Sequence, residues 1–231
     1  MREFNISIYS LLIQHFIDKE TIQKINAGTI LFQEKDMVDH VYILLSGSIA
    51  LGRLHMTGKE FTLKILTGEE ILVEYQLFKP APRYFFYAKA MTNCEVFMIS
   101  REKFEEFLLE DSYRLSAMTS WLSTRYLKAQ MKCQDLIING KRGGLYSILI
   151  RLSNSYGVMT DNGILIDLPL THQELANLTF GTREVIQRLL KELREKNIIA
   201  YERQRITIKD ISYLKAEVDC QNCPYEICGL N

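Results

Sequence analysis

The chain has 231 residues, of which 47% are hydrophobic and 24% charged, as in an ordinary globular protein with room for one or two domains. Lysine plus arginine and aspartate plus glutamate number 28 each, so any nucleic acid must be bound by a local basic patch rather than by net charge. The apolar runs are too short to span a bilayer, and the first residues do not have the pattern of a signal peptide. We therefore expect a cytoplasmic protein without a membrane partner.

Short apolar stretches separated by glycine turns dominate the first hundred residues. Six of them predict β-strands: Thr29–Phe32, Val41–Leu45, Ser48–Leu51, Phe61–Leu66, Tyr84–Tyr87 and Glu95–Ile99. Many short strands with glycine at the turns are typical of a sandwich or jelly-roll barrel.

Two helices are predicted next, because Arg101–Leu109 and Tyr113–Asn139 contain neither glycine nor proline. Along the second, apolar positions with heptad spacing predict a seam that pairs with its own copy in a homodimer: Leu122, Tyr126, Ala129, Cys133 and Leu136. The alternative is that this face packs against the barrel of its own chain.

Three glycines in the segment Gly140–Gly144 predict the end of the long helix and a hinge. A short amphipathic helix, Leu145–Ser155, is expected after it. A loop or hairpin containing Gly157 and Asn162-Gly163 then follows.

The segment from Thr171 to about Lys196 has the pattern of a helix-turn-helix. Thr171 and Glu174 form a capping box at the start of a two-turn helix, and Thr182 caps a longer second helix. Phe180-Gly181 makes the turn between them. On the second helix, the positions with the spacing of a buried stripe are Ile186, Leu189, Leu190 and Leu193.

The opposite face of that helix carries the candidate DNA contacts: Thr182, Arg183, Glu184, Gln187 and Arg188, with Lys191 beyond them. Arginine can bind guanine with two hydrogen bonds, and glutamate can accept one from cytosine. Asn197–Tyr201 and Arg205–Ile208 are predicted to form a hairpin that acts as a wing. Residues 182–209 hold eight lysines and arginines against four glutamates, the local positive charge that phosphates require.

Three cysteines lie near the C-terminus in the spacing Cys-x-x-Cys-x₄-Cys, at Cys220, Cys223 and Cys228. In a reducing compartment such a cluster indicates metal or redox chemistry rather than disulfides. Three thiolates leave one iron of a cubane, or one position of a tetrahedral zinc, to a ligand elsewhere in the chain. The residues alone leave an iron–sulfur cluster, a zinc site and an unmetallated redox thiol set open.

The order of these parts resembles the Crp/Fnr superfamily over nearly the whole chain. Thr182-Arg183-Glu184 followed by Arg188 is similar to the recognition-helix pattern of that family. The resemblance implies an α+β chain: an N-terminal double-stranded β-helix (a jelly roll of the cyclic-nucleotide-binding type), a long dimerisation helix and a C-terminal winged helix-turn-helix. The implied domains are residues 1–110, 111–139 and 140–219, with a cysteine tail at 220–231.

By the same resemblance, we expect a homodimer that binds a palindrome of the TGTGA…TCACA kind and contacts RNA polymerase. The loop Tyr156–Gly163 is the candidate for the polymerase contact.

The cysteine tail resembles that of the Gram-positive Fnr branch, in which three C-terminal cysteines and an aspartate ligate a [4Fe–4S] cluster. The aspartate of that branch lies near the end of the dimer helix, which nominates Asp135 as the fourth ligand. The alternatives for Asp135 are a solvated helix residue or the partner of a salt bridge. Cys94 is expected in the strand core and Cys133 in the dimer helix, with a ligand role for Cys133 as a further alternative.

The phosphate cassette of cyclic-AMP-binding members is degenerate here. Val73-Glu74 and Arg83-Tyr84 replace its Gly-Glu and Arg-Ser, and two prolines between them remove amide donors. We therefore expect no bound cyclic nucleotide, and Glu74 and Arg83 are predicted to form a structural ion pair.

These features predict a transcription regulator of anaerobic genes that senses oxygen through [4Fe–4S]. Two other classes compete: a regulator that responds to a metabolite or nucleotide and has a zinc-stabilised or redox-thiol tail, and a module that uses the fold without binding DNA. An enzyme is not expected, because no nucleophile–base set or phosphate loop is visible and the histidines are scattered: His15, His40, His55 and His172.

Overall fold

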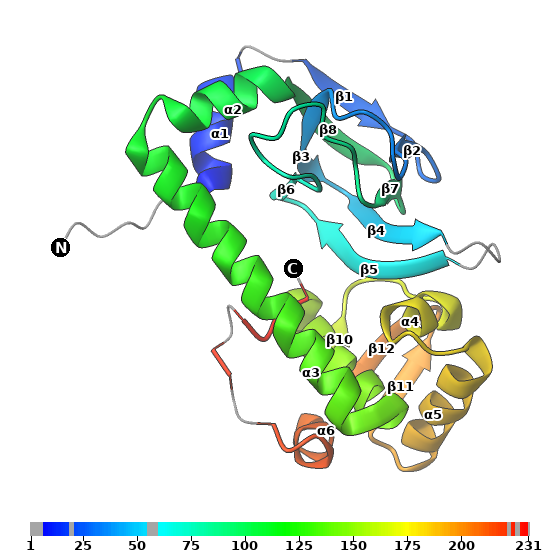
Figure 1. The fold of residues 1–231 in the computed structure, drawn as a ribbon. Coiled ribbons are helices and arrows are strands. Elements are labelled where there is room, and N and C mark those ends of the chain that lie inside the picture. The colour runs from blue at the N-terminus through cyan, green and yellow to red at the C-terminus, as the bar shows by residue number, and fades with distance from the viewer. Residues whose placement is uncertain (1–6, 19–20, 55–59, 221–222, 225–226, 231) are drawn as a thin grey trace. The chain divides into compact units, whose positions relative to one another are not determined.

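The structure is a computed structural model that describes residues 7–18, 21–54, 60–220, 223–224 and 227–230. It divides into two compact units, Met1–Ser123 and Thr124–Asn231 (Figure 1). The division falls within the predicted dimerisation helix, and the functional boundaries at residues 110, 139 and 219 remain predictions.

The first unit holds two four-stranded antiparallel sheets, in the orders β1-β8-β3-β6 and β2-β7-β4-β5. Most successive strands switch from one sheet to the other, as in a jelly roll, and the predicted fold class is confirmed. Its elements are α1 (Ile8–Phe16), β1 (Ile22–Ile25), β2 (Ile30–Phe32), β3 (His40–Ser46), β4 (Ser48–Leu54), β5 (Glu60–Thr67), β6 (Glu70–Leu72), β7 (Tyr87–Ala90), β8 (Cys94–Ser100) and α2 (Arg101–Leu109).

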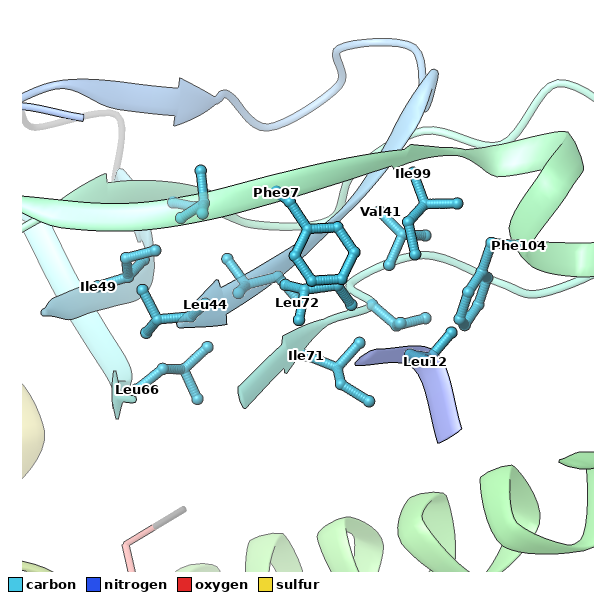
Figure 2. Close-up of a cluster of buried hydrophobic side chains, with 14 of the residues drawn as sticks. Leu12, Val41, Leu44, Ile49, Leu66, Ile71, Leu72, Phe97, Ile99 and Phe104 are labelled. Atoms are coloured by element: carbon cyan, nitrogen blue, oxygen red, sulfur yellow. The ribbon is translucent and has the colours of Figure 1, made fainter. Parts of the chain in front are cut away.

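Figure 2 shows the core of this unit, where side chains of both sheets meet those of the two helices. Leu12 of α1 and Phe104 of α2 are fully buried against strand residues such as Ile71 and Phe97. Helix α1, which sequence analysis did not predict, is capped by Ser7, whose hydroxyl accepts a hydrogen bond from the Ser10 amide (3.1 Å).

The predicted strand Tyr84–Tyr87 is wrong, because β7 begins only at Tyr87. The ring of Tyr84 is buried and stacks on Phe32 with centroids 3.8 Å apart, and its hydroxyl donates to the His40 carbonyl (2.5 Å). Tyr84 is thus an interior aromatic residue outside the sheet ladder, whereas Phe85 is 53% exposed. The short strands β1 and β6 were also missed.

Helix α3 (Ser112–Tyr156) is two helical parts joined at Gly140, whose φ of 59° and ψ of −161° are not helical. This backbone conformation is essentially restricted to glycine. The predicted end of the long helix is therefore confirmed, but the following helix starts directly after Gly140 rather than at Leu145. Gly143 and Gly144 lie inside it.

The absence of side chains at these two glycines lets the parts of α3 pack closely. A Cβ on Gly143 would lie 2.2 Å from the Cβ of Asn139, and one on Gly144 would lie 2.8 Å from Leu136 Cδ2. The chain therefore turns back on itself at Gly140, as Figure 1 shows for the end of α3.

The rest of the second unit combines helices with one four-stranded sheet in the order β11-β12-β10-β9. Pairing of β10 with β12 joins the wing hairpin to the hairpin that follows α3. The elements are β9 (Gly157–Thr160), β10 (Gly163–Ile166), α4 (His172–Leu178), α5 (Arg183–Glu195), β11 (Ile199–Glu202), β12 (Arg205–Ile208) and α6 (Ile211–Glu217).

The wing is bonded to the residue just before α4. The Leu170 amide donates to the Gln204 carbonyl (2.7 Å), and the Tyr201 hydroxyl donates to the Leu170 carbonyl (2.8 Å). Arg203 and Gln204 form the turn with φ of 49° and 64°. Across the described residues, no helix is both long and apolar enough to cross a membrane.

Candidate functional site

The predicted helix-turn-helix is present as α4 and α5. Thr171 and Glu174 form the capping box, and the Thr182 hydroxyl caps α5 by accepting from the Val185 amide (3.4 Å). The turn holds Phe180 at a φ of 51°, and the buried Gly181 donates to the Ala176 carbonyl (2.9 Å). The stripe predicted to be buried is buried: Ile186, Leu189, Leu190 and Leu193.

The opposite face of α5 is open to solvent. All five predicted contact residues are exposed: Thr182, Arg183, Glu184, Gln187 and Arg188. The helix N-terminus and its first turn therefore offer polar side chains, with two guanidinium groups among them, to a ligand outside the protein.

The wing hairpin carries two more arginines near the predicted DNA contacts of α5, and one of them is paired with a carboxylate. Arg203 is exposed at the turn, whereas Arg205 forms a salt bridge with Asp167 (3.1 Å). His172 of α4 stacks on Tyr201 of the wing strand β11, with ring centroids 4.9 Å apart. Burial, followed by the nearby charges of Arg183 and Arg194, lowers the pKa of His172.

A cavity of about 170 Å³ in the second unit brings the predicted metal ligands together. Its volume is well above the roughly 10–15 Å³ that one water molecule needs. The lining includes all four predicted ligands, which come from α3 and from the tail after α6: Asp135, Cys220, Cys223 and Cys228. Burial raises the pKa of the Cys228 thiol, and the positive charge of Arg151 opposes this shift.

Arg151 is a residue of this cavity that sequence analysis missed. It is 5% exposed and forms a salt bridge with Asp135 (Nη2 to Oδ2, 2.7 Å). Asp135 therefore forms a salt bridge, which sequence analysis gave as one alternative to a role as metal ligand. The sequence feature that could have identified it is that Arg151 is the single charged residue in the mostly apolar stretch 145–152. A charged side chain that is buried there requires a partner.

The four predicted ligands are three thiols and one carboxyl group, which are donor types found in zinc and iron–sulfur sites. Within the described ranges, no three His, Cys, Asp or Glu side chains converge tightly enough to hold one metal ion. Each ligand of a cubane binds a different iron, so its donors lie farther apart around a larger volume.

The ion pair predicted between Glu74 and Arg83 is wrong. Glu74 pairs instead with Lys64 of β5 (2.7 Å), and Arg83 donates to the Lys35 carbonyl (2.7 Å). The end of the loop with the two prolines also forms an isolated β-bridge between Arg83 and Met37.

The predicted dimer seam is open in the single chain. Leu136 is half-buried. The other four residues of the seam are exposed: Leu122, Tyr126, Ala129 and Cys133. Cys94 is buried among strands, as predicted, and burial raises the pKa of its thiol.

Comparisons with known proteins agree with this architecture. Residues 22–111 match the family of cyclic nucleotide-binding domains, and residues 145–217 match the Crp-like helix-turn-helix domain. The chain is 40% identical to the "Anaerobic regulatory protein" of Bacillus subtilis (strain 168) over 91% of its own length and 89% of the relative. It is 30% identical to the "Global nitrogen regulator" of Synechococcus elongatus over 81% and 85% of the two chains.

Solved structures show the same fold at low sequence identity. The c-di-GMP responsive global regulator CLP of Xanthomonas campestris has a TM-score of 0.75 at 23% identity, covering 87% of this chain and 99% of that one. FixK2 of Bradyrhizobium japonicum has a TM-score of 0.74 at 14% identity over 85% and 96%. The matched relatives are regulators rather than enzymes, and this chain belongs to the Crp/Fnr family of DNA-binding transcription regulators.

Proposed function

We propose that this regulator controls anaerobic gene expression and senses oxygen through a [4Fe–4S] cluster held by Cys220, Cys223, Cys228 and Asp135. The observation that carries the proposal is that these four side chains, up to 93 positions apart in the sequence, line one cavity. The 40% identity to a Bacillus regulator named for anaerobic control supports it.

The four residues lie on the two sides of the DNA-binding elements in the sequence. Asp135 precedes the break at Gly140, whereas the cysteines follow α6. Common ligation would join the first part of α3 to the tail, and α4 and α5 lie between these two segments in the sequence. When bound, the cluster would supply oxygen-sensitive iron, and the Asp135 carboxylate, a harder ligand than thiolate, would be its weakest attachment.

The proposed DNA target is a TGTGA-type palindrome bound by a homodimer. Arg183, Glu184 and Arg188 would read base edges in each half-site, and the open seam of α3 would pair the two subunits. For RNA polymerase, the proposed contact is the β9–β10 hairpin, where Val158 and Met159 are 49% and 78% exposed.

Cyclic AMP is not the proposed effector. Beside the degenerate cassette, the buried ring of Tyr84 stacks on Phe32, and Glu74 is paired with Lys64. Neither group is available to a cyclic phosphate or ribose without breaking an existing contact.

The deciding experiment is purification of the intact protein without oxygen, followed by iron, acid-labile sulfide and zinc analysis and an absorption spectrum. About four irons and four sulfides per chain, with broad sulfur-to-iron absorption that bleaches in air, is the expected result. Stoichiometric zinc, or no metal at all, would reject the oxygen-sensing proposal and favour the zinc or redox-thiol tail.

A matched pair of variants tests the fourth ligand. Asp135→Ala should shorten the lifetime of the cluster in air, whereas Asp219→Ala removes another carboxylate of the same cavity and should not. Equal lifetimes for wild type and Asp135→Ala would remove Asp135 from the ligand set.

A further inference from the structure

Arg151 is a buried cation at the wall of the cysteine cavity. It is 5% exposed, and its guanidinium reaches both the first part of α3 and the tail. Nε and Nη2 donate to Asp135 Oδ2 at 3.1 and 2.7 Å, and Nη1 donates to the carbonyls of Ile227 and Gly229 at 3.2 and 3.5 Å. One side chain thus connects the two segments that carry the proposed ligands.

The two hydrogen bonds from Arg151 to Asp135 leave one carboxylate oxygen, Oδ1, available to a ligand. Both go to Oδ2, and Oδ1 accepts no hydrogen bond from any residue that the structure describes. A guanidinium that holds one oxygen fixes the orientation of the carboxylate and leaves the other oxygen for a ligand bond, as the partners of metal-binding carboxylates commonly do.

The backbone around the third cysteine is held from the same helix. The carbonyls that Arg151 binds flank Cys228, and Asn154 Nδ2 donates to the carbonyl of Cys228 itself (2.6 Å). One residue further, the Leu230 amide donates to the Ser155 hydroxyl (2.8 Å). These bonds need no metal, so the docking of residues 227–230 is built from the protein alone.

Charge gives Arg151 a second role. Three thiolates and a carboxylate would place four negative charges around one cavity, and buried anions are costly without a positive partner. Of the described residues that line this cavity, Arg151 is the one with a positive charge.

We propose that Arg151 is a positioning residue of the cysteine site: it orients Asp135, docks the backbone on both sides of Cys228 and balances the negative charge of the bound group. This inference rests on the proposed function for the identity of the group, but its docking part holds for the metal-free protein. Arg151 itself is not a ligand.

The first test uses metal-free protein, so that it does not depend on a cluster. The rate at which iodoacetamide alkylates Cys228 is measured by mass spectrometry relative to the rate for the same thiol in the chain unfolded in urea, because Cys133 belongs to the predicted dimer seam. Arg151→Met should raise this ratio about five- to tenfold and speed hydrogen exchange of the Leu230 amide. Arg142→Met, which breaks the more exposed ion pair with Glu192 in the same unit, is the matched control and should change neither.

The second test uses protein loaded without oxygen and compares Arg151→Met with Arg151→Lys. Loss of the positive charge should lower the reduction potential of the cluster in the methionine variant, and lysine should restore the potential because it keeps the charge. Lysine has no planar fork for several acceptors, so Cys228 alkylation should remain faster than in wild type in that variant. If Arg151 only stabilised the fold, lysine would not restore the reduction potential while leaving Cys228 alkylation fast.

The outcomes distinguish the two proposals. If wild type assembles no cluster, oxygen sensing fails, and the alkylation ratio still decides whether Arg151 docks the tail. If wild type holds a cluster but the Arg151 variants match it in potential, air lifetime and Cys228 alkylation, the role of Arg151 is overturned. Circular dichroism checks that each variant folds. If Arg151→Met does not fold, Arg151→Lys and Asn154→Ala replace it in the alkylation test. Wild-type alkylation rates of Cys228 in both of these variants would overturn the docking role of Arg151.

Discussion

The Cα of Gly143 lies against the Asn139 side chain across the break in α3, so that a hydrogen atom fits at the Cβ position of residue 143 and a methyl group does not. A Cβ at Gly143 would lie 2.2 Å from the Asn139 Cβ, which belongs to the rigid start of that side chain. We expect Gly143→Ala to lower the free energy of unfolding by about 1–3 kcal/mol, because the two helical parts must move apart. Chemical denaturation measured by circular dichroism gives this value.

Gly144→Ala is the matched control for that change. Its Cβ would meet only the flexible end of Leu136 at 2.8 Å, and alanine gains about 1 kcal/mol over glycine in a helix. The stability should therefore stay within about 1 kcal/mol of wild type. Equal losses for both variants would show that the parts of α3 do not pack as described.

Arg183 and Arg188 are expected to contribute directly to sequence recognition. Alanine at either position should weaken binding to the TGTGA-type palindrome by about 1–3 kcal/mol and relax preference at the base pair that it contacts. Fluorescence anisotropy at fixed salt, with matched and mutated half-sites, measures both effects. Lys24→Ala removes an exposed cation of the first unit and should leave the affinity unchanged; a comparable loss there would indicate a general charge effect.

Cyclic AMP is expected to leave the protein unchanged. A ligand that binds the folded state at one hundred times its Kd would stabilise it by about 2.7 kcal/mol and raise the melting temperature. Thermal unfolding with and without millimolar cyclic AMP should give the same midpoint, with a cyclic-AMP-activated relative as the positive control. A clear upward shift would mean that Tyr84 moves out of the interior to admit the nucleotide.

The pH dependence of stability should include a contribution from His172. Its pKa is lowered in the folded protein, so the folded state favours neutral imidazole, while the unfolded chain titrates near the usual value of about 6.5. Below that pH the unfolded state binds more protons, and stability falls as the pH decreases. Denaturation of metal-free wild type and His172→Gln between pH 5 and 7.5 should show a shallower decline in the variant. Parallel curves would assign the decline to other groups.

Much of the DNA-binding region was predictable because its signals are local. The capping box of Thr171 and Glu174 and the cap at Thr182 depend on residues three positions apart, and the stripe on α5 depends on helical period alone. The positions of Gly140 and of the cysteine triplet were likewise visible in the sequence.

The contacts that were missed or wrong depend on residues far apart in the chain. Arg151 meets Asp135 and the tail across 16 and 76 positions, so the sequence shows an isolated charge but not its partners. The Glu74–Arg83 pair failed for a related reason: Lys64 lies ten positions before Glu74, and the fold rather than the local sequence brings these two side chains together. Tyr84 was assigned to a strand because buried aromatic residues and strand residues have similar composition.

The two hydrogen bonds of Leu170 to the wing constrain how this protein can be regulated. They bond the turn at Gln204 and the ring of Tyr201 to the residue that leads into α4, which favours the wing and the helix pair acting as one unit. The distance between a base-edge contact from α5 and a phosphate contact from the wing is then fixed within each subunit. In the proposed homodimer, a signal from the tail would then have to change the distance between two whole DNA-binding bodies, rather than the geometry within either of them.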